Sequence, residues 1–128
     1  MTRSLNKIMV IGRLGRDPEL RFTPSGKSVC SFSVACDHTW KSADGESHTE
    51  TEWFNVVAWG YLAEFSKDSL SKGSLVYVEG RLQTRTWQDQ NGNQHKSTEI
   101  IASDLLFLEG KKDNKPLNLP ETDEEYPF

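Results

Sequence analysis

The sequence predicts an all-β domain that carries one helix and ends in a disordered tail. Three observations predict this fold class: strand-like runs dominate the chain up to Glu109, only one stretch has helical spacing, and the composition changes abruptly after Glu109. A chain of 128 residues has room for a single core and a tail. Its hydrophobic content of 35% and charged content of 27% are typical of a soluble globular protein.

The first strand is predicted at KIMVIGRL, residues 7–14, because its nearly continuous apolar character is expected of a strand buried on both faces. Two further strand-like runs lie within LRFTPSGKSVCSFSVAC, residues 20–36, around a turn at residues 23–26 that has Pro and Gly in the favoured positions. Alternate residues of the second run share one face. The predicted core residues of this run are Cys30, Phe32, Val34 and Cys36.

The remaining elements follow in order. Residues 37–50, DHTWKSADGESHTE, are polar and contain a DG dipeptide, which predicts a long hairpin loop. TEWFNVVAWG, residues 51–60, returns as a strand, and YLAEFSKDSLSKG, residues 61–73, is the helix candidate, with its final KG as the stop signal. The last two strands are predicted at residues 74–88 and 95–109, with an NG turn between them.

Five or six strands with one helix after the third match a small Greek-key barrel. This order is the one expected of an OB-fold, a five-stranded barrel whose sheet face binds oligonucleotides or oligosaccharides. Other small barrels also carry one helix, so the order alone leaves them open. Residues 1–109 are therefore the predicted barrel domain, and residues 110–128, which show no periodicity, are the predicted linker and tail.

Aromatic rings alternate with guanidinium groups on one face of the strand at residues 74–88, whereas its other face is apolar near the start. The odd positions are Tyr77, Glu79, Arg81, Gln83, Arg85 and Trp87. Trp53 and Trp59 share a face of the preceding strand, and Trp40 lies in the polar loop. Core burial is the usual alternative for tryptophan, but these polar neighbours favour surface platforms. Exposed rings beside cations suit a single nucleic-acid strand, since unpaired bases stack on rings while Arg and Lys neutralise phosphates.

These stretches resemble the bacterial-type single-stranded DNA-binding protein (SSB) family. The similarity covers residues 5–108, in NKIMVIGRLGRDPELRFTPSGKSVCSFSVA, TEWFNVVAWGYLAE and KGSLVYVEGRLQTRTWQDQNG, and returns in the acidic ending. It implies an OB-fold, a homotetramer, and binding of single-stranded DNA without sequence preference, catalysis or a cofactor. With no export signal recognised in the sequence, the expected location is cytoplasmic and nucleoid-associated.

The resemblance also implies roles for individual residues. The family's stacking aromatics fall on Trp40, Trp53, Trp59 and Trp87. Its basic phosphate contacts match at Lys7, Arg21, Lys72 and Arg85, the strand pattern adds Arg81, and Arg13 is expected as a further phosphate contact. Asn55 and Tyr61 replace basic residues of well-known members, for which Arg13 and Arg16 could compensate, and Phe54 stands where those members have a histidine at a subunit contact.

The chain closes on an acidic run followed by an apolar ring. The resemblance implies a docking peptide for replication, recombination and repair proteins, formed by Asp123, Glu124, Glu125, Tyr126, Pro127 and Phe128. A phenylalanine ring can enter an apolar pocket while the carboxylates meet Lys or Arg around it. The alternative is a solubility tail, in which a terminal ring would serve no purpose. Only GKKDNKPLNL separates barrel and tip, whereas typical members have a much longer linker.

Other classes of protein find little support. The sequence has no GxxxxGK[ST] loop and no HExxH pair, and His38, His48 and His95 are interpreted as solvated loop residues, so no catalytic or metal site is expected. The two cysteines stand six residues apart, about 20 Å along an extended strand, and cannot form a disulfide with each other. The early apolar run of residues 8–11 is too short to span a membrane. A primosome-type OB protein and a polypeptide-binding adaptor remain as alternatives.

Overall fold

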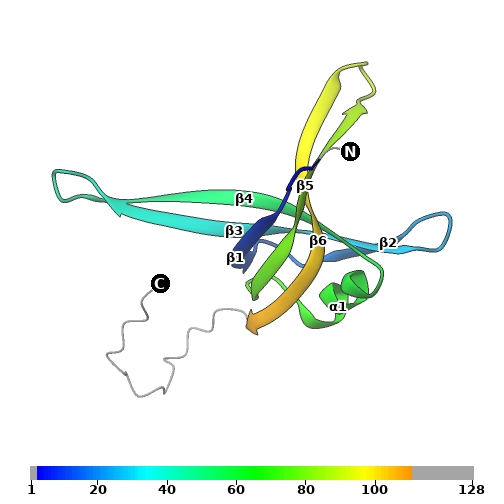
Figure 1. Cartoon of the computed structure of the whole chain (residues 1–128), viewed down its shortest axis with the longest axis horizontal. Coiled ribbons are helices and arrows are strands. Elements are labelled where there is room, and N and C mark those ends of the chain that lie inside the picture. Colours follow the sequence, from blue (N-terminus) through cyan, green and yellow to red (C-terminus); the bar gives the residue numbers. More distant parts are fainter. Residues whose placement is uncertain (1–2, 111–128) are drawn as a thin grey trace.

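Six strands and one helix make up residues 3–110, the part of the chain that this computed structural model describes (Figure 1). The elements in chain order are β1 (Ile8–Leu14), β2 (Glu19–Phe22), β3 (Ser28–Lys41), β4 (Ser47–Trp59), α1 (Tyr61–Ser69), β5 (Leu75–Gln88) and β6 (Gln94–Glu109). The predicted linker and tail, residues 110–128, lie outside the described residues except for Gly110.

The strands form one sheet that closes on itself. Their order is β1-β5-β6-β4-β3-β2, and an additional pairing of β1 with β3 completes the barrel. Because β2 lies beyond this closure, next to β3, five strands form the barrel: β1, β3, β4, β5 and β6. α1 follows β4, the third of these five. The predicted fold class, a five-stranded barrel with one helix after the third strand, is confirmed.

Alternation along the strands fills the barrel interior. Phe32, Val34 and Cys30 on β3 are at most 2% exposed, and Cys36 lies half-buried at the end of the same row. The predicted core face of this strand is therefore confirmed. Burial raises the pKa of the Cys30 thiol, so this cysteine stays protonated and behaves as a small core residue.

The helix closes one side of the barrel but ends earlier than the sequence predicted. Leu62 and Leu70 join the core cluster, while the Ser66 hydroxyl donates a hydrogen bond to the Leu62 carbonyl oxygen (2.7 Å). The helix ends at Ser69, and Leu70 already has an extended backbone. The predicted KG stop was wrong because Gly73 serves the next turn, where its N–H donates to the Leu14 carbonyl oxygen (2.9 Å).

Three hairpins use the same five-residue turn. In each, the first N–H donates to the fifth carbonyl oxygen, and the N–H of the fourth residue, a glycine, donates to the first carbonyl oxygen. That glycine has a positive φ in all three turns, a conformation that suits residues without a Cβ. The three turns occupy residues 23–27, 42–46 and 89–93, as the PSG, DG and NG signals predicted.

The long loop predicted at residues 37–50 was wrong. β3 and β4 continue their pairing to Lys41 and Ser47, so only a five-residue turn separates them. Both faces of this ribbon are polar, which hides the strand period, but backbone pairing and the contact between the Thr39 and Thr49 hydroxyls (3.1 Å) support it. For the same reason His38 and His48, which were assigned to this loop, lie on strands, and His95 lies on β6.

Two long hairpins therefore project from the barrel (Figure 1). We define the β3–β4 arm as residues 37–52 and the β5–β6 arm as residues 83–98. Almost every residue in either arm is exposed or half-buried, so neither arm contributes to the core.

Candidate nucleic-acid interface

All four tryptophan side chains lie at the surface. Their exposed fractions are 40% for Trp40, 58% for Trp53, 43% for Trp59 and 40% for Trp87, and none of them belongs to the core cluster of residues 3–110. The predicted surface position of these rings is confirmed. Their role in stacking on bases stays a prediction.

An open groove of about 590 Å³ crosses the outer face of the sheet. The register creates it, because Asn55 and Gln83 both lie opposite Glu99 and so bring the outward residues of β4, β5 and β6 onto one face. Short side chains such as Ser31 and Ser97 keep the groove open.

Cations dominate the lining of this groove. Beside Trp59 it contains four exposed arginines, Arg16, Arg21, Arg81 and Arg85, and a single acid, Glu99, which gives the lining a net charge of +3. The Arg85 Nε lies 3.4 Å from the Glu99 carboxylate, and the Arg81 guanidinium donates a hydrogen bond to the Gln83 side-chain oxygen (2.9 Å). A concave, positively charged surface of this kind attracts a polyanion.

Trp53 occupies a position that only glycine at residue 15 permits. A Cβ built on Gly15 would lie 2.5 Å from the Trp53 ring and 3.2 Å from the Ser33 hydroxyl. The Gly15 N–H also donates to the Ser33 carbonyl oxygen (3.1 Å), which fixes this loop against β3. The ring therefore rests close to the main chain while most of it remains exposed.

The two remaining tryptophans stand on the arms, each stacked on histidine. The ring centroid of Trp40 lies 5.6 Å from that of His38 and 5.4 Å from that of His48. Trp87 lies 5.4 Å from His95, and the Arg85 guanidinium lies 4.9 Å from the Trp87 ring centroid, in a cation–π contact. Each arm thus presents an aromatic column, and on the β5–β6 arm that column carries a cation.

Sequence reasoning missed these histidine contacts, although the sequence contains a signal for them. Trp40 and His48 stand symmetrically about the first arm's DG turn, and Trp87 and His95 stand symmetrically about the NG turn of the second. Both arms read W-x3-[DN]-G-x2-H. Since a five-residue turn fixes the register, this spacing pairs tryptophan with histidine across the strands.

Three of the predicted phosphate ligands lie outside the groove lining: Lys7, Lys72 and Arg13. The Lys7 ammonium stands 3.6 Å from the Glu79 carboxylate, whose other oxygen accepts a hydrogen bond from the Tyr77 hydroxyl (2.7 Å). That hydrogen bond, with a smaller effect of Lys7, holds the pKa of Glu79 below its usual value, so the acid stays charged beside the lysine. Lys72 is exposed, and its backbone N–H donates to the Asp17 carboxylate (2.8 Å).

Arg13 has a different environment from the groove arginines. Its guanidinium donates to the carbonyl oxygens of Gly73 (2.8 Å) and Gly110 (3.3 Å) and lies 3.5 Å from the Glu109 carboxylate. These contacts tie the end of β6 to the barrel. Arg16, which the sequence offered only as a compensating residue, is the one that lines the groove.

Comparison with known proteins identifies the family. The model of the single-strand binding protein family matches residues 5–108, almost the whole described barrel. The chain belongs to this family. Single-stranded DNA-binding proteins of Neisseria meningitidis serogroup A and Chlorobaculum tepidum are 45% and 48% identical to it, over 87% and 89% of this chain respectively.

A solved structure shares the fold. The chain of the Plasmodium falciparum SSB complex with ssDNA is 36% identical and superposes with a TM-score of 0.79, over 85% of this chain and 99% of that one. The chain spans 64% of the length of the Neisseria relative and 70% of the Chlorobaculum one. Within residues 3–110, no helix has the length and apolar character needed to cross a membrane.

Proposed function

We propose that this protein binds single-stranded DNA without sequence preference and without catalysis. One observation carries the proposal: Trp59 shares a groove with four arginines, and three further exposed tryptophans surround this sheet face and its arms. The family relationship and the ssDNA complex of the Plasmodium protein support it. In this role the protein protects exposed strands during replication, recombination and repair, in the cytoplasm at the nucleoid.

The chemistry of the groove accounts for binding that tolerates any sequence. Each base has a π-face that can stack on an indole ring, a contact worth about 1–3 kcal/mol per base in single-strand-binding proteins generally. The arginines neutralise backbone phosphates, which are the same at every nucleotide. Neither contact reads the edge of a base, so neither distinguishes one base from another.

Titration of tryptophan fluorescence with oligo-dT tests the proposal. We expect strong quenching at low salt, because stacked bases quench indole emission, and weaker binding as salt rises, because the release of cations condensed on the DNA phosphates then contributes less free energy. A chain that shows no quenching at low salt does not bind single-stranded DNA by this surface. The same result would favour the alternative of a polypeptide-binding adaptor.

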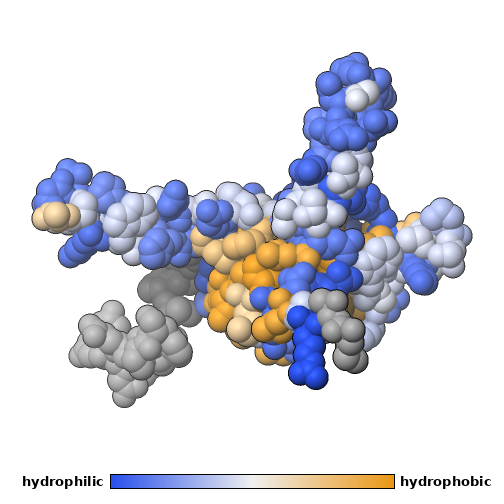
Figure 2. Space-filling model, turned by 45° about the horizontal axis from the view of Figure 1, so that its top comes forward, coloured by the Kyte–Doolittle hydropathy of each residue, from blue (hydrophilic) through white to orange (hydrophobic). Residues whose placement is uncertain are grey.

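We further propose that the protein assembles into a homotetramer. Met9 and Ile11 on β1 and Leu106 on β6 are 60%, 55% and 51% exposed, and Ile11 and Leu106 both lie opposite Tyr77 in the register. Figure 2 shows hydrophobic residues gathered on the barrel, whereas both arms are largely hydrophilic. Contiguous exposed apolar surface of this kind is typical of an interaction site.

Light scattering tests the assembly. A tetramer mass is expected for the natural chain, and Ile11→Lys should lower that mass because it places a charge on the apolar face. Thr39→Lys, on the exposed β3–β4 arm, is the matched control and should leave the mass unchanged. A monomeric natural chain would contradict this part of the proposal.

The C-terminal tip is proposed as the docking peptide for replication, recombination and repair proteins. Burial of the Phe128 ring in a partner pocket would contribute roughly 1.5–3 kcal/mol, and the carboxylates of Asp123, Glu124 and Glu125 would steer the encounter. Deletion of Phe128 should therefore abolish capture of the partner proteins while oligo-dT affinity stays the same. Pull-downs that lose no partner on this deletion would reject the docking role.

A further inference from the structure

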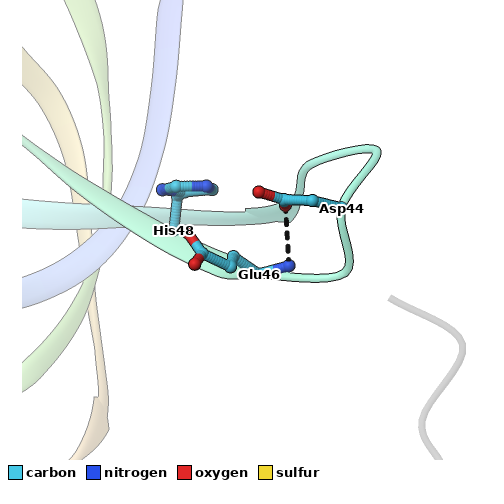
Figure 3. Close-up of side chains that lie close together, drawn as sticks. All are labelled: Asp44, Glu46 and His48. Atoms are coloured by element: carbon cyan, nitrogen blue, oxygen red, sulfur yellow. Dashed lines mark hydrogen bonds between the residues drawn. The ribbon is translucent and has the colours of Figure 1, made fainter.

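The tip of the β3–β4 arm brings together three side chains that can ligate a metal ion. Asp44, Glu46 and His48 each offer one ligand atom, and these atoms all lie within 4.8 Å of one another. Asp44 lies in the turn and His48 at the start of β4, and Figure 3 shows the Asp44 carboxylate directed toward the His48 ring. Consecutive members of this set are two residues apart in the sequence, so all three lie within one short segment of the chain.

Existing contacts already hold two of these ligands, Asp44 and His48, in place. The Glu46 N–H donates to the Asp44 carboxylate (3.1 Å), which also accepts a hydrogen bond from the Ser42 hydroxyl. The Ser42 hydroxyl in turn lies 3.2 Å from the His48 Nε2, and the His48 ring is fixed by its stacking on Trp40.

The charge of the arm is an independent reason to expect a cation. Residues 37–52 contain five acids and one lysine, a net charge of −4 with neutral histidines, whereas residues 83–98 have a net charge of +1. Trp40, a proposed stacking residue for the polyanion DNA, therefore lies on a negatively charged hairpin. An ion held by two of the acids would remove much of this repulsion at the position of the ring.

We propose that Asp44, Glu46 and His48 bind a divalent transition-metal ion of the Zn²⁺ type, which gives the β3–β4 arm a contact for a DNA phosphate beside Trp40. One imidazole and two carboxylates form a donor set that suits Zn²⁺, whereas Mg²⁺ and Ca²⁺ prefer oxygen ligands throughout. Three protein ligands leave a fourth tetrahedral position for water or a phosphate oxygen. The phosphate contact rests on the proposed function; the metal site does not.

The β5–β6 arm provides a matched control within the same chain. It has the same turn and the same Trp–His pair, but Asn91 and Asn93 stand where the first arm has its two carboxylates. His95 instead contacts the carboxylate of Asp89 (2.7 Å), which leaves a two-ligand set. The second arm should therefore bind no ion with comparable affinity.

Calorimetric titration of the full chain with Zn²⁺, without DNA, tests the site. We expect His48→Gln and Glu46→Gln each to weaken Zn²⁺ binding by about tenfold or more, since loss of even a supporting partner of a metal ligand costs about that much. His95→Gln should leave the affinity unchanged. The acids of the C-terminal tip are present in every variant and contribute the same background heat to each titration. Binding heat is therefore assigned to the site only if it is lost in His48→Gln. Equal Zn²⁺ affinity in the natural chain and His48→Gln, with circular dichroism unchanged, would overturn the site.

A second titration with oligo-dT, at fixed ionic strength, tests the phosphate contact. Zn²⁺ should raise the affinity of the natural chain by about eightfold at about 0.05 M salt, the value for one further neutralised phosphate, and leave that of His48→Gln unchanged. Zn²⁺ binding without any gain in DNA affinity would overturn the phosphate contact. A chain that never binds oligo-dT would overturn the proposed function, and the calorimetry would still decide the metal site.

Discussion

Replacement of Arg21 by glutamine removes one of the four guanidinium groups that line the groove. For a single strand, each neutralised phosphate contributes about −0.7 to the slope of log affinity against log salt. Four groove arginines therefore predict a slope of about −2.8, and Arg21→Gln a slope of about −2.1. The same relation predicts a loss of affinity of about threefold at about 0.2 M salt and about eightfold at about 0.05 M.

Fluorescence titration with an oligo-dT of about eight nucleotides measures these slopes, because that length falls in the range that one OB barrel covers. Arg13→Gln is the matched control. Its guanidinium is held by the carbonyl oxygens of Gly73 and Gly110 and by the Glu109 carboxylate. We expect this variant to melt at a lower temperature, since charged hydrogen bonds are lost, and to keep the salt slope of the natural chain.

The direction of the affinity change in a third variant provides a further check. Glu99 is the one acid among the groove-lining residues and lies 3.4 Å from Arg85. Glu99→Gln should therefore raise the affinity for oligo-dT, because Arg85 no longer has to give up its contact with the Glu99 carboxylate in order to bind a phosphate. The reasoning fails if Arg13→Gln flattens the salt slope as much as Arg21→Gln, or if Glu99→Gln weakens binding.

Three further predictions concern the rings and the arms. Trp87→Ala should weaken oligo-dT binding by about 1–3 kcal/mol with unchanged circular dichroism, and unaltered affinity would show that this face is not the platform. Gly15→Ala should weaken binding about as much as Trp53→Ala, because the new Cβ displaces the Trp53 ring; near-ultraviolet dichroism reports the displacement. The contact from His95 lowers the pKa of Asp89, so its stabilising effect is complete above the usual carboxyl pKa and is lost as pH falls below about 4. Nuclear magnetic resonance should show the β5–β6 turn loosening in that range, and Asp89→Asn should remove the pH dependence.

Much of the fold was predictable because its signals are local. The three turns depend on a glycine at a fixed position, and the core row of β3 depends on strict alternation, so each could be read from a few residues. The length of the β3–β4 arm could not be predicted in this way. Its strands are polar on both faces, and their pairing shows only when both strands are placed together.

The candidate site, too, was predictable only where its signals are local in the sequence. Exposure of Trp40 and Trp87 followed from their polar neighbours, which are adjacent in the sequence. The different environments of Arg13 and Arg21 could not be predicted, because both residues stand in short strand-like segments near the N-terminus. Closure of the barrel through the pairing of β1 with β3 separates them: Arg13 reaches the end of β6, whereas Arg21, on β2, lines the groove.

Strand β5 carries both proposed surfaces on residues of the same phase, and a bulge in its partner strand β6, with Ser103 as the extra residue, lies opposite the boundary between them. Tyr77, before the bulge, pairs with residues of the apolar face, whereas Arg81, after it, lines the groove. The register shift falls between Glu79 and Gly80, and a Cβ on Gly80 would lie 2.1 Å from the Ile101 carbonyl oxygen.

Because a bulge bends its own strand and increases the local twist of the pair, the bulge in β6 opposite Gly80 sets the angle between the apolar face and the groove. The backbone of β6 cannot move aside as a side chain can, so Gly80→Ala should lower both the light-scattering mass and the oligo-dT affinity. Ile11→Lys should change only the mass, and Arg21→Gln only the affinity. If Gly80→Ala leaves both properties as they are in the natural chain, the bulge does not connect the two surfaces and their orientation must be set by other contacts of the barrel.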